Sequence, residues 1–184
     1  MSKDVIETEF RLGIKSKKGF NSNVTKLIYD EFMDKLLKLK YNKKTTMEFT
    51  DHLYKNGIRI RKNKSRDQII RKEKILIIDL ISQGSNSLID VRFSISKEIK
   101  LNNNDVPLDE RPLIKHKTRT SFLFDYWTWD LTHTREKDRN TYEVELELKE
   151  GYDGIKGIQN AFGMVRKLIP ENKNYNPKLS YIKL

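Results

Sequence analysis

Apolar and polar residues alternate along most of this chain, and a period of two is typical of half-buried β-strands. The alternation predicts eight strands. Between the second and third of them, the pair Asn56-Gly57 favours a tight hairpin. The predicted strands cover residues 5–14, 46–53, 58–61, 67–80, 87–101, 113–124, 127–133 and 141–149.

In two segments the apolar period changes to that of a helix. Residues 24–40 carry apolar side chains at helical spacing, with Ser22 or Asn23 expected to cap the first turn. Residues 155–169 form a second such segment before Pro170. Because the helices follow the first and last strands and do not alternate with strands, we expect a mainly β (α+β) fold: an eight-stranded antiparallel β-barrel with flanking helices. Residues 1–184 are expected to form one domain.

Most of the predicted strands have one charged face and one apolar face. Arg59 and Arg61 share a face, Arg92 shares a face with Glu98, and the strand at 141–149 has an all-acidic face. If the apolar faces pack outward against the helices, the charged faces must point into the barrel. We therefore predict a hydrophilic, charged lumen.

Two strands concentrate carboxylates on one face. Glu143, Glu145 and Glu147 lie two residues apart near one end of the chain, and Glu7 and Glu9 repeat the spacing near the other. Neighbouring carboxylates repel each other unless cations lie between them. A divalent metal site shared by the two strands explains the pattern; the alternative is that both acidic faces are simply solvated.

Composition narrows the choice of partner and metal. A formal net charge of +11 indicates a polyanionic partner such as nucleic acid, a nucleotide or polyphosphate, or a membrane surface. With no cysteine and only three histidines, a metal would have to be bound by oxygen, which favours Mg²⁺ or Mn²⁺. There is no N-terminal signal segment and no apolar run near ~20 residues, so we expect a soluble protein that is not secreted by that route.

Carboxylates and basic residues in one lumen suit a triphosphate ligand. Glutamates would bind a divalent cation that contacts phosphate oxygens, while arginines and lysines neutralise the remaining oxygens. A further glutamate would position a water molecule for hydrolysis of the terminal phosphate.

Several motifs together resemble a known family. Glu7-x-Glu9 with Glu143-x-Glu145-x-Glu147 resembles the metal-dependent RNA 5′-triphosphatases of fungi, protozoa and viruses, within the triphosphate tunnel metalloenzyme superfamily. Segments 72–75, 92–98, 117–122 and 130–132 look like further strands of that family in the same order, so the resemblance spans about residues 6–149. It implies an eight-stranded tunnel that removes the γ-phosphate from the RNA 5′ end, the first step of mRNA capping. It also implies hydrolysis of nucleoside triphosphates with manganese or cobalt.

The resemblance also implies roles for individual side chains. The implied metal ligands are Glu7, Glu9 and Glu147. The residues implied to orient the attacking water are Glu98 and Glu145. The implied phosphate-binding residues are Arg59, Arg61, Lys72, Lys74, Lys117 and Arg119, the last two at the γ-phosphate. The implied supporting residues are Arg11, Arg92, Asp130 and Glu143.

The sequence leaves alternatives open for the substrate, the partners and the location of the protein. Arg11 stands where bacterial and animal relatives in the superfamily carry a lysine, which favours the RNA branch and leaves thiamine triphosphate or polyphosphate as other substrates. A nonenzymatic, basic RNA-binding barrel is the rival class. The expected partners are 5′-triphosphate RNA, nucleoside triphosphates and a capping guanylyltransferase, as a separate subunit or a fused domain. We expect a monomer or homodimer without a membrane partner, in the nucleus of a cell, or in host cytoplasm or a virion if the source is viral.

Overall fold

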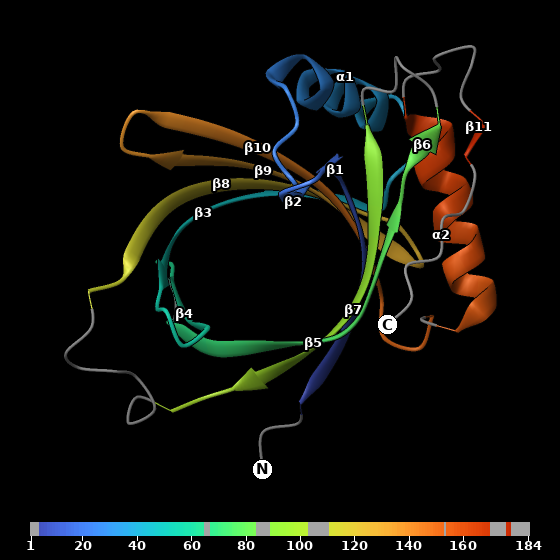
Figure 1. Ribbon diagram of the computed structural model, residues 1–184. Helices are drawn as coiled ribbons and strands as arrows, with labels where there is room; N and C mark the ends of the chain where they lie inside the picture. The colour runs from blue at the N-terminus through green and yellow to red at the C-terminus, as the bar shows by residue number, and fades with distance from the viewer. Residues whose placement is uncertain are drawn as a thin grey trace.

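The computed structural model describes residues 4–64, 67–83, 89–102, 111–152, 154–169 and 176–177. Strands dominate these residues, and two helices accompany them (Figure 1). The elements are β1 (Val5–Ser16), β2 (Gly19–Asn21), α1 (Lys26–Leu37), β3 (Lys43–Leu53), β4 (Ile58–Lys62), β5 (Gln68–Leu80), β6 (Ser82–Gln83), β7 (Asp90–Lys100), β8 (Leu113–Leu123), β9 (Trp127–Glu136), β10 (Arg139–Leu148), α2 (Ile155–Leu168) and β11 (Asn176–Pro177).

Eight of these strands close into an antiparallel barrel. Their order is β10-β9-β8-β3-β4-β5-β7-β1, and pairing between β1 and β10 closes the ring. Figure 1 looks into this ring, with α1 outside β9 and β10 and α2 outside β1. The eight predicted strands are these eight, so the predicted barrel is confirmed. Residues 87–88, expected to begin one strand, lie outside the described residues.

The first helix begins later than predicted because the residues before it bind β10. Ser22 donates a hydrogen bond of 2.8 Å to Glu143, and the Asn23 side chain accepts one of 2.8 Å from the backbone N–H of Tyr142. Neither residue caps the helix. Thr25 is the N-cap, its hydroxyl accepting from the backbone N–H of Ile28. The predicted caps instead fix the connection from β2 to the barrel wall.

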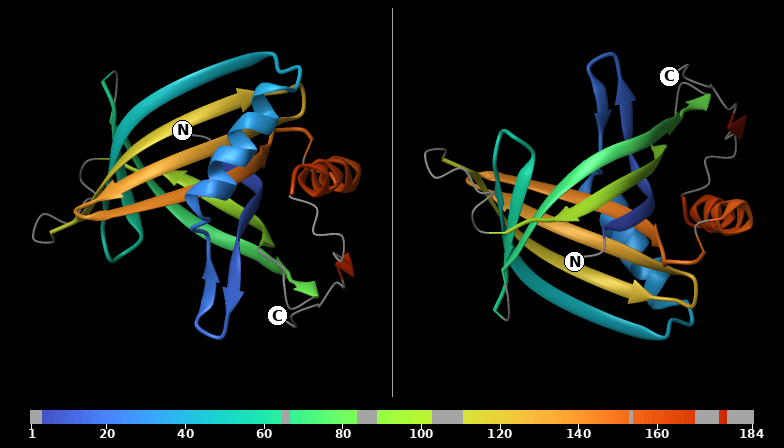
Figure 2. Two further views of the ribbon diagram at one scale, coloured as in Figure 1. Left: turned by 90° about the horizontal axis from the view of Figure 1, so that it is seen from above. Right: turned by 90° about the horizontal axis from the view of Figure 1, so that it is seen from below.

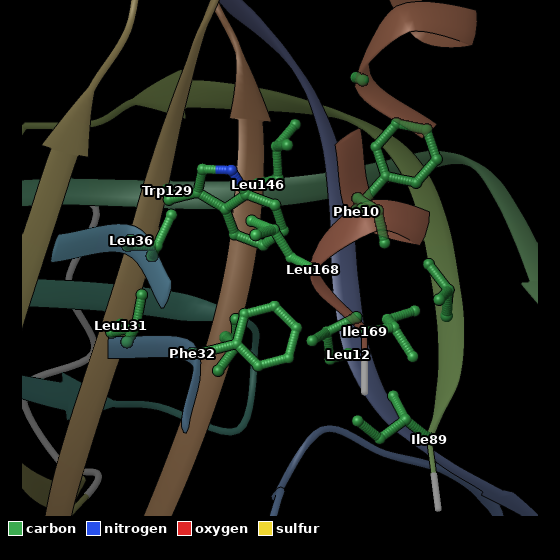
Figure 3. Close-up of a cluster of buried hydrophobic side chains, with 14 of the residues drawn as sticks. Phe10, Leu12, Phe32, Leu36, Ile89, Trp129, Leu131, Leu146, Leu168 and Ile169 are labelled. Carbon is green, nitrogen blue, oxygen red and sulfur yellow. The ribbon is translucent and has the colours of Figure 1, made fainter. Parts of the chain in front are cut away.

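The apolar core lies between the barrel and the helices, as the alternation predicts. Outward-facing side chains of β1, β9 and β10 meet side chains of α1 and α2 (Figure 3). The rings of Phe32 and Trp129, both fully buried, have centroids 5.8 Å apart, and Phe10 stacks on Phe162 at 6.0 Å. The apolar strand faces are therefore taken up by this core, which leaves the opposite faces to line the lumen.

The β1–β2 hairpin projects from one end of the barrel (Figure 2). Gly13 permits its close pairing, because a Cβ there would lie 2.6 Å from the Phe20 ring. The ring covers the Arg92 guanidinium at 4.4 Å, and Arg92 forms two hydrogen bonds with Asp79, of 2.7 and 3.1 Å. None of the described helices is long and apolar enough to cross a membrane.

Candidate functional site

The register of β1 and β10 brings the two acidic strands together. Glu9 lies directly opposite Glu147, and Arg11 lies opposite Glu145. On the other side of β1, Glu9 faces Ser94, whose hydroxyl donates a hydrogen bond of 3.0 Å to it. Carboxylates more than 130 residues apart in the sequence thus become neighbours on adjacent strands.

The ammonium group of Lys72 lies against Glu7 and Glu9. It forms an ion pair with Glu7 and lies 3.5 Å from Glu9 Oε2. Burial would lower the pKa of Lys72, but the charges of Glu9 and Glu7 outweigh it and raise that pKa. Lys72 on β5 therefore supplies positive charge to the acidic pair on β1.

Glu147 has no such partner among the described residues. Burial, reinforced by the negative charges of Glu7 and Asp130, raises the pKa of Glu147 to about 8. A carboxyl group with this pKa holds a proton at neutral pH unless a cation replaces it. Glu147 is thus the carboxyl group of the acidic strands with the strongest need for added positive charge.

Glu145, two residues earlier, is in the opposite situation. Its carboxylate lies 2.6 Å from Arg11 and 3.5 Å from Arg119. Burial alone would raise the pKa of Glu145, but the two guanidinium groups outweigh it and hold the pKa at about 2. Glu145 is therefore a permanent anion that joins the acidic strands to the basic side of the lumen.

Glu98 on β7 completes the acidic group. Its carboxylate accepts a hydrogen bond of 3.1 Å from Arg59, and burial together with the nearby Glu7 raises its pKa. The hydroxyl of Ser96, opposite Glu7 across the strand pair, is buried and has no hydrogen-bond partner among the described residues. Beside Glu7 there is thus a hydroxyl donor without a partner in addition to the ammonium group of Lys72.

The basic side of the lumen is organised around Asp51, which is not among the residues predicted from the sequence. Asp51 on β3 is fully buried and lies 3.0 Å from Lys117 and 3.3 Å from Arg61. Burial would raise its pKa, but Lys117 and Arg61 lower it, so Asp51 stays ionised. In the hairpin of β3 and β4, Asp51 lies opposite Arg61, so its side chain points to the same side of the sheet as Arg59 and Arg61. This alternation is a signal in the sequence that could have identified Asp51.

Arg119 is held by a second aspartate. Its guanidinium donates hydrogen bonds of 2.7 Å to Asp130 and 3.0 Å to Thr132, and Ser121 donates one of 2.6 Å to Asp130. The Phe49 ring lies 4.5 Å from Arg61 and 5.9 Å from Arg119. Three cations are thereby fixed side by side with some of their donors free for a ligand.

Three predicted residues lie apart from this group. Lys74 is exposed opposite Ser96, with no ion pair to any described residue. Glu143 binds Ser22 at the start of α1, and Arg92 binds Asp79 beneath the β1–β2 hairpin. The contacts of Glu143 and Arg92 stabilise the barrel wall and its end.

The oxygen atoms on the acidic strands are of the chemical type that binds a divalent cation. Glu7, Glu9 and Glu147 offer carboxylate oxygens on adjacent strands, the ligands preferred by Mg²⁺ and Mn²⁺. The raised pKa of Glu147 shows that positive charge would be favourable there. In the described part of the chain, however, no three carboxylates or imidazoles are grouped closely enough to bind an ion as they stand.

Comparisons with known proteins agree with this geometry. The family model described as mRNA capping enzyme, beta chain, matches residues 1–163. The Pct1 RNA triphosphatase of S. pombe, solved in complex with the Spt5 CTD, is 20% identical, with 89% of this chain and 85% of that chain covered and a TM-score of 0.71. The Mimivirus capping enzyme triphosphatase is 15% identical, with 90% of each chain covered and a TM-score of 0.62. A comparison with curated proteins gives no match. At these identities, the structural likeness establishes the tunnel fold.

Proposed function

Because the chain belongs to the mRNA capping enzyme beta chain family, whose members hydrolyse the 5′-triphosphate of RNA, we propose that it releases the γ-phosphate from nascent mRNA. The products would be a 5′-diphosphate end and inorganic phosphate, the first step of cap formation. One observation carries the proposal: a closed barrel whose lumen places an acidic group opposite fixed cations.

We propose that four cations of the lumen bind the phosphate oxygens: Arg59, Arg61, Lys117 and Arg119. Asp51 and Asp130 hold three of these cations in place before the substrate arrives, so little ordering is needed on binding. A triphosphate brings several negative charges to a group of cations whose own carboxylate partners neutralise them only in part. Lys72 and Lys74 are proposed as additional phosphate ligands on β5.

Glu7, Glu9 and Glu147 are proposed to hold a divalent cation, Mg²⁺ or Mn²⁺. Bound there, the ion would act as a Lewis acid on the terminal phosphate. Ser94 fixes Glu9 for this role through its hydrogen bond of 3.0 Å, and Lys72 neutralises the same carboxylates in the structure described.

Glu98 and Glu145 are proposed to orient the attacking water. Of the two, Glu98 is better suited to accept a proton from the attacking water, because a carboxylate with a raised pKa is the stronger base. Glu145, with a pKa of about 2, is suited to accepting a hydrogen bond from the water and holding Arg119.

The test is phosphate release from 5′-triphosphate RNA with Mn²⁺. We expect Glu9→Gln and Glu147→Gln to abolish release. The thermal unfolding temperature should change little for Glu147→Gln, because the Glu147 carboxyl, with a pKa of about 8, is already neutral at pH 7. It should fall for Glu9→Gln, which removes a partner of Lys72 and Arg11, so release is measured below that unfolding temperature. RNA-binding affinity should survive in both variants. Continued release by either variant would contradict the assigned roles. Retained RNA binding with no release by the wild-type protein would favour a nonenzymatic binder.

A substrate panel tests the finer assignment. We propose that ATP is hydrolysed as a side activity, since its triphosphate offers the lumen the same groups. Faster turnover of thiamine triphosphate or tripolyphosphate than of RNA would identify a small-molecule phosphohydrolase instead.

A further inference from the structure

A groove on the outer wall of the barrel remains unexplained by the lumen chemistry. Its volume is about 1090 Å³, slightly more than that of most small-molecule sites. The walls come from the end of β4, the middle of β3, the first half of β8 and the end of β9. Side chains that alternate with lumen residues point into it, among them Thr50, His116 and Thr118.

The groove carries an excess of positive charge. Four cations of the lining form no ion pair with any described residue: Lys62, Lys64, Arg135 and Lys137. Among the carboxylates of the described lining, only Glu48 is without an ion pair. Lys117 also lines the groove, but Asp51 neutralises it, and the lining residue Glu136 is neutralised by Lys115. An elongated anionic ligand would satisfy four cations on opposite walls.

The groove is continuous with the barrel end where β8 begins. Leu113 at the start of β8 lines it, as do Glu136 and Lys137 at the turn between β9 and β10. Lys115, in phase with Lys117 inside the barrel, pairs with Glu136 at 3.2 Å at this rim. A chain leaving the lumen over this rim reaches the outer groove directly.

We propose that this groove binds the ribose-phosphate backbone of the nucleotides that follow the 5′-triphosphate of the RNA. The inference rests on the proposed function of the lumen and extends it: the lumen takes the triphosphate, and the groove distinguishes an RNA chain from a free nucleotide. Lys62 and Arg135 grip phosphates from opposite walls. Thr50 and His116 are hydrogen-bonded to each other at 3.3 Å, so the Thr50 hydroxyl's remaining capacity, His116 Nε2 and the Thr118 hydroxyl offer hydrogen bonds to ribose hydroxyls.

The experiment compares two double charge reversals of equal size. Lys62→Glu/Arg135→Glu alters the groove, and Lys17→Glu/Lys18→Glu alters exposed lysines in the β1–β2 turn, away from the groove. Binding of a roughly ten-nucleotide 5′-triphosphate RNA is measured by fluorescence anisotropy across a salt series, and the KM values for this RNA and for ATP are measured with Mn²⁺.

We expect the groove variant to bind RNA at least about tenfold more weakly at low salt, with a log-log salt slope smaller by about 1.4, since each single-strand phosphate contact contributes about 0.7. Its KM for RNA should rise while its KM for ATP stays unchanged. An unaltered affinity and slope, or an equal loss in the turn variant, would overturn the proposal. If the wild-type protein releases no phosphate, the proposed function fails, and the anisotropy series still decides the groove.

Discussion

Replacing Asp51 by Asn tests whether the basic side of the lumen depends on a buried anion. The substitution keeps the size of the side chain but removes the charge that neutralises Lys117 and Arg61, at 3.0 and 3.3 Å. Loss of one partner from a buried ion pair typically costs about 3–5 kcal/mol. Because Asn retains one hydrogen-bond acceptor, we expect the free energy of unfolding to fall by about 3 kcal/mol, which lowers the Tm by roughly 6–12 °C for a chain of this size.

The dependence of this loss on pH separates charge from packing. The pKa of Asp51 is lowered in the folded protein, so its charge stabilises the fold above the ordinary aspartate pKa of about 4. That contribution disappears as the pH falls through the lowered folded-state value. The difference in Tm between wild type and Asp51→Asn should therefore be full at pH 7 and shrink as the pH falls below about 4.

Thermal unfolding followed by circular dichroism at several pH values provides the measurement. Asp30→Asn is the matched control, because Asp30 forms an exposed ion pair with Lys26 on α1, and such pairs contribute little. Its Tm should equal that of the wild type at pH 7. A Tm difference for Asp51→Asn that is absent at pH 7, or that stays constant into acid, would refute the charge argument.

Three further outcomes follow from particular contacts. Because the pKa of Glu147 is about 8, Mn²⁺ binding at pH 7 should release most of one proton in calorimetry across buffers of different ionisation enthalpy, and Glu147→Gln should release almost none. Phe32→Ala should lower the free energy of unfolding by about 3–5 kcal/mol in urea titrations, since it empties a fully buried site against Trp129. Gly157→Ala should lower the Tm although alanine favours helices, because the new methyl group would overlap the Tyr152 carbonyl; a higher Tm would show that the start of α2 can move.

The sequence itself determined the barrel strands and the inward direction of their charges. The strands are regular enough that alternation alone locates them, and the division into an apolar face and a polar face is clearest on β9 and β10. The very short β2, β6 and β11 escaped prediction because two or three residues cannot display a period. The cap of α1 was misplaced because Ser22 and Asn23 have the right chemistry for a cap but bind β10 instead.

Only the tertiary structure decided which charges become partners. Alternation places Glu145 and Glu147 on the same face, yet one is held ionised by Arg11 and Arg119 and the other is left among carboxylates. Asp51 likewise became the centre of the basic side through strand pairing. The physical reason is that a period of two fixes the face of a side chain, whereas its pKa and its partners depend on strand register, on burial and on charges brought within a few ångströms by closure of the barrel.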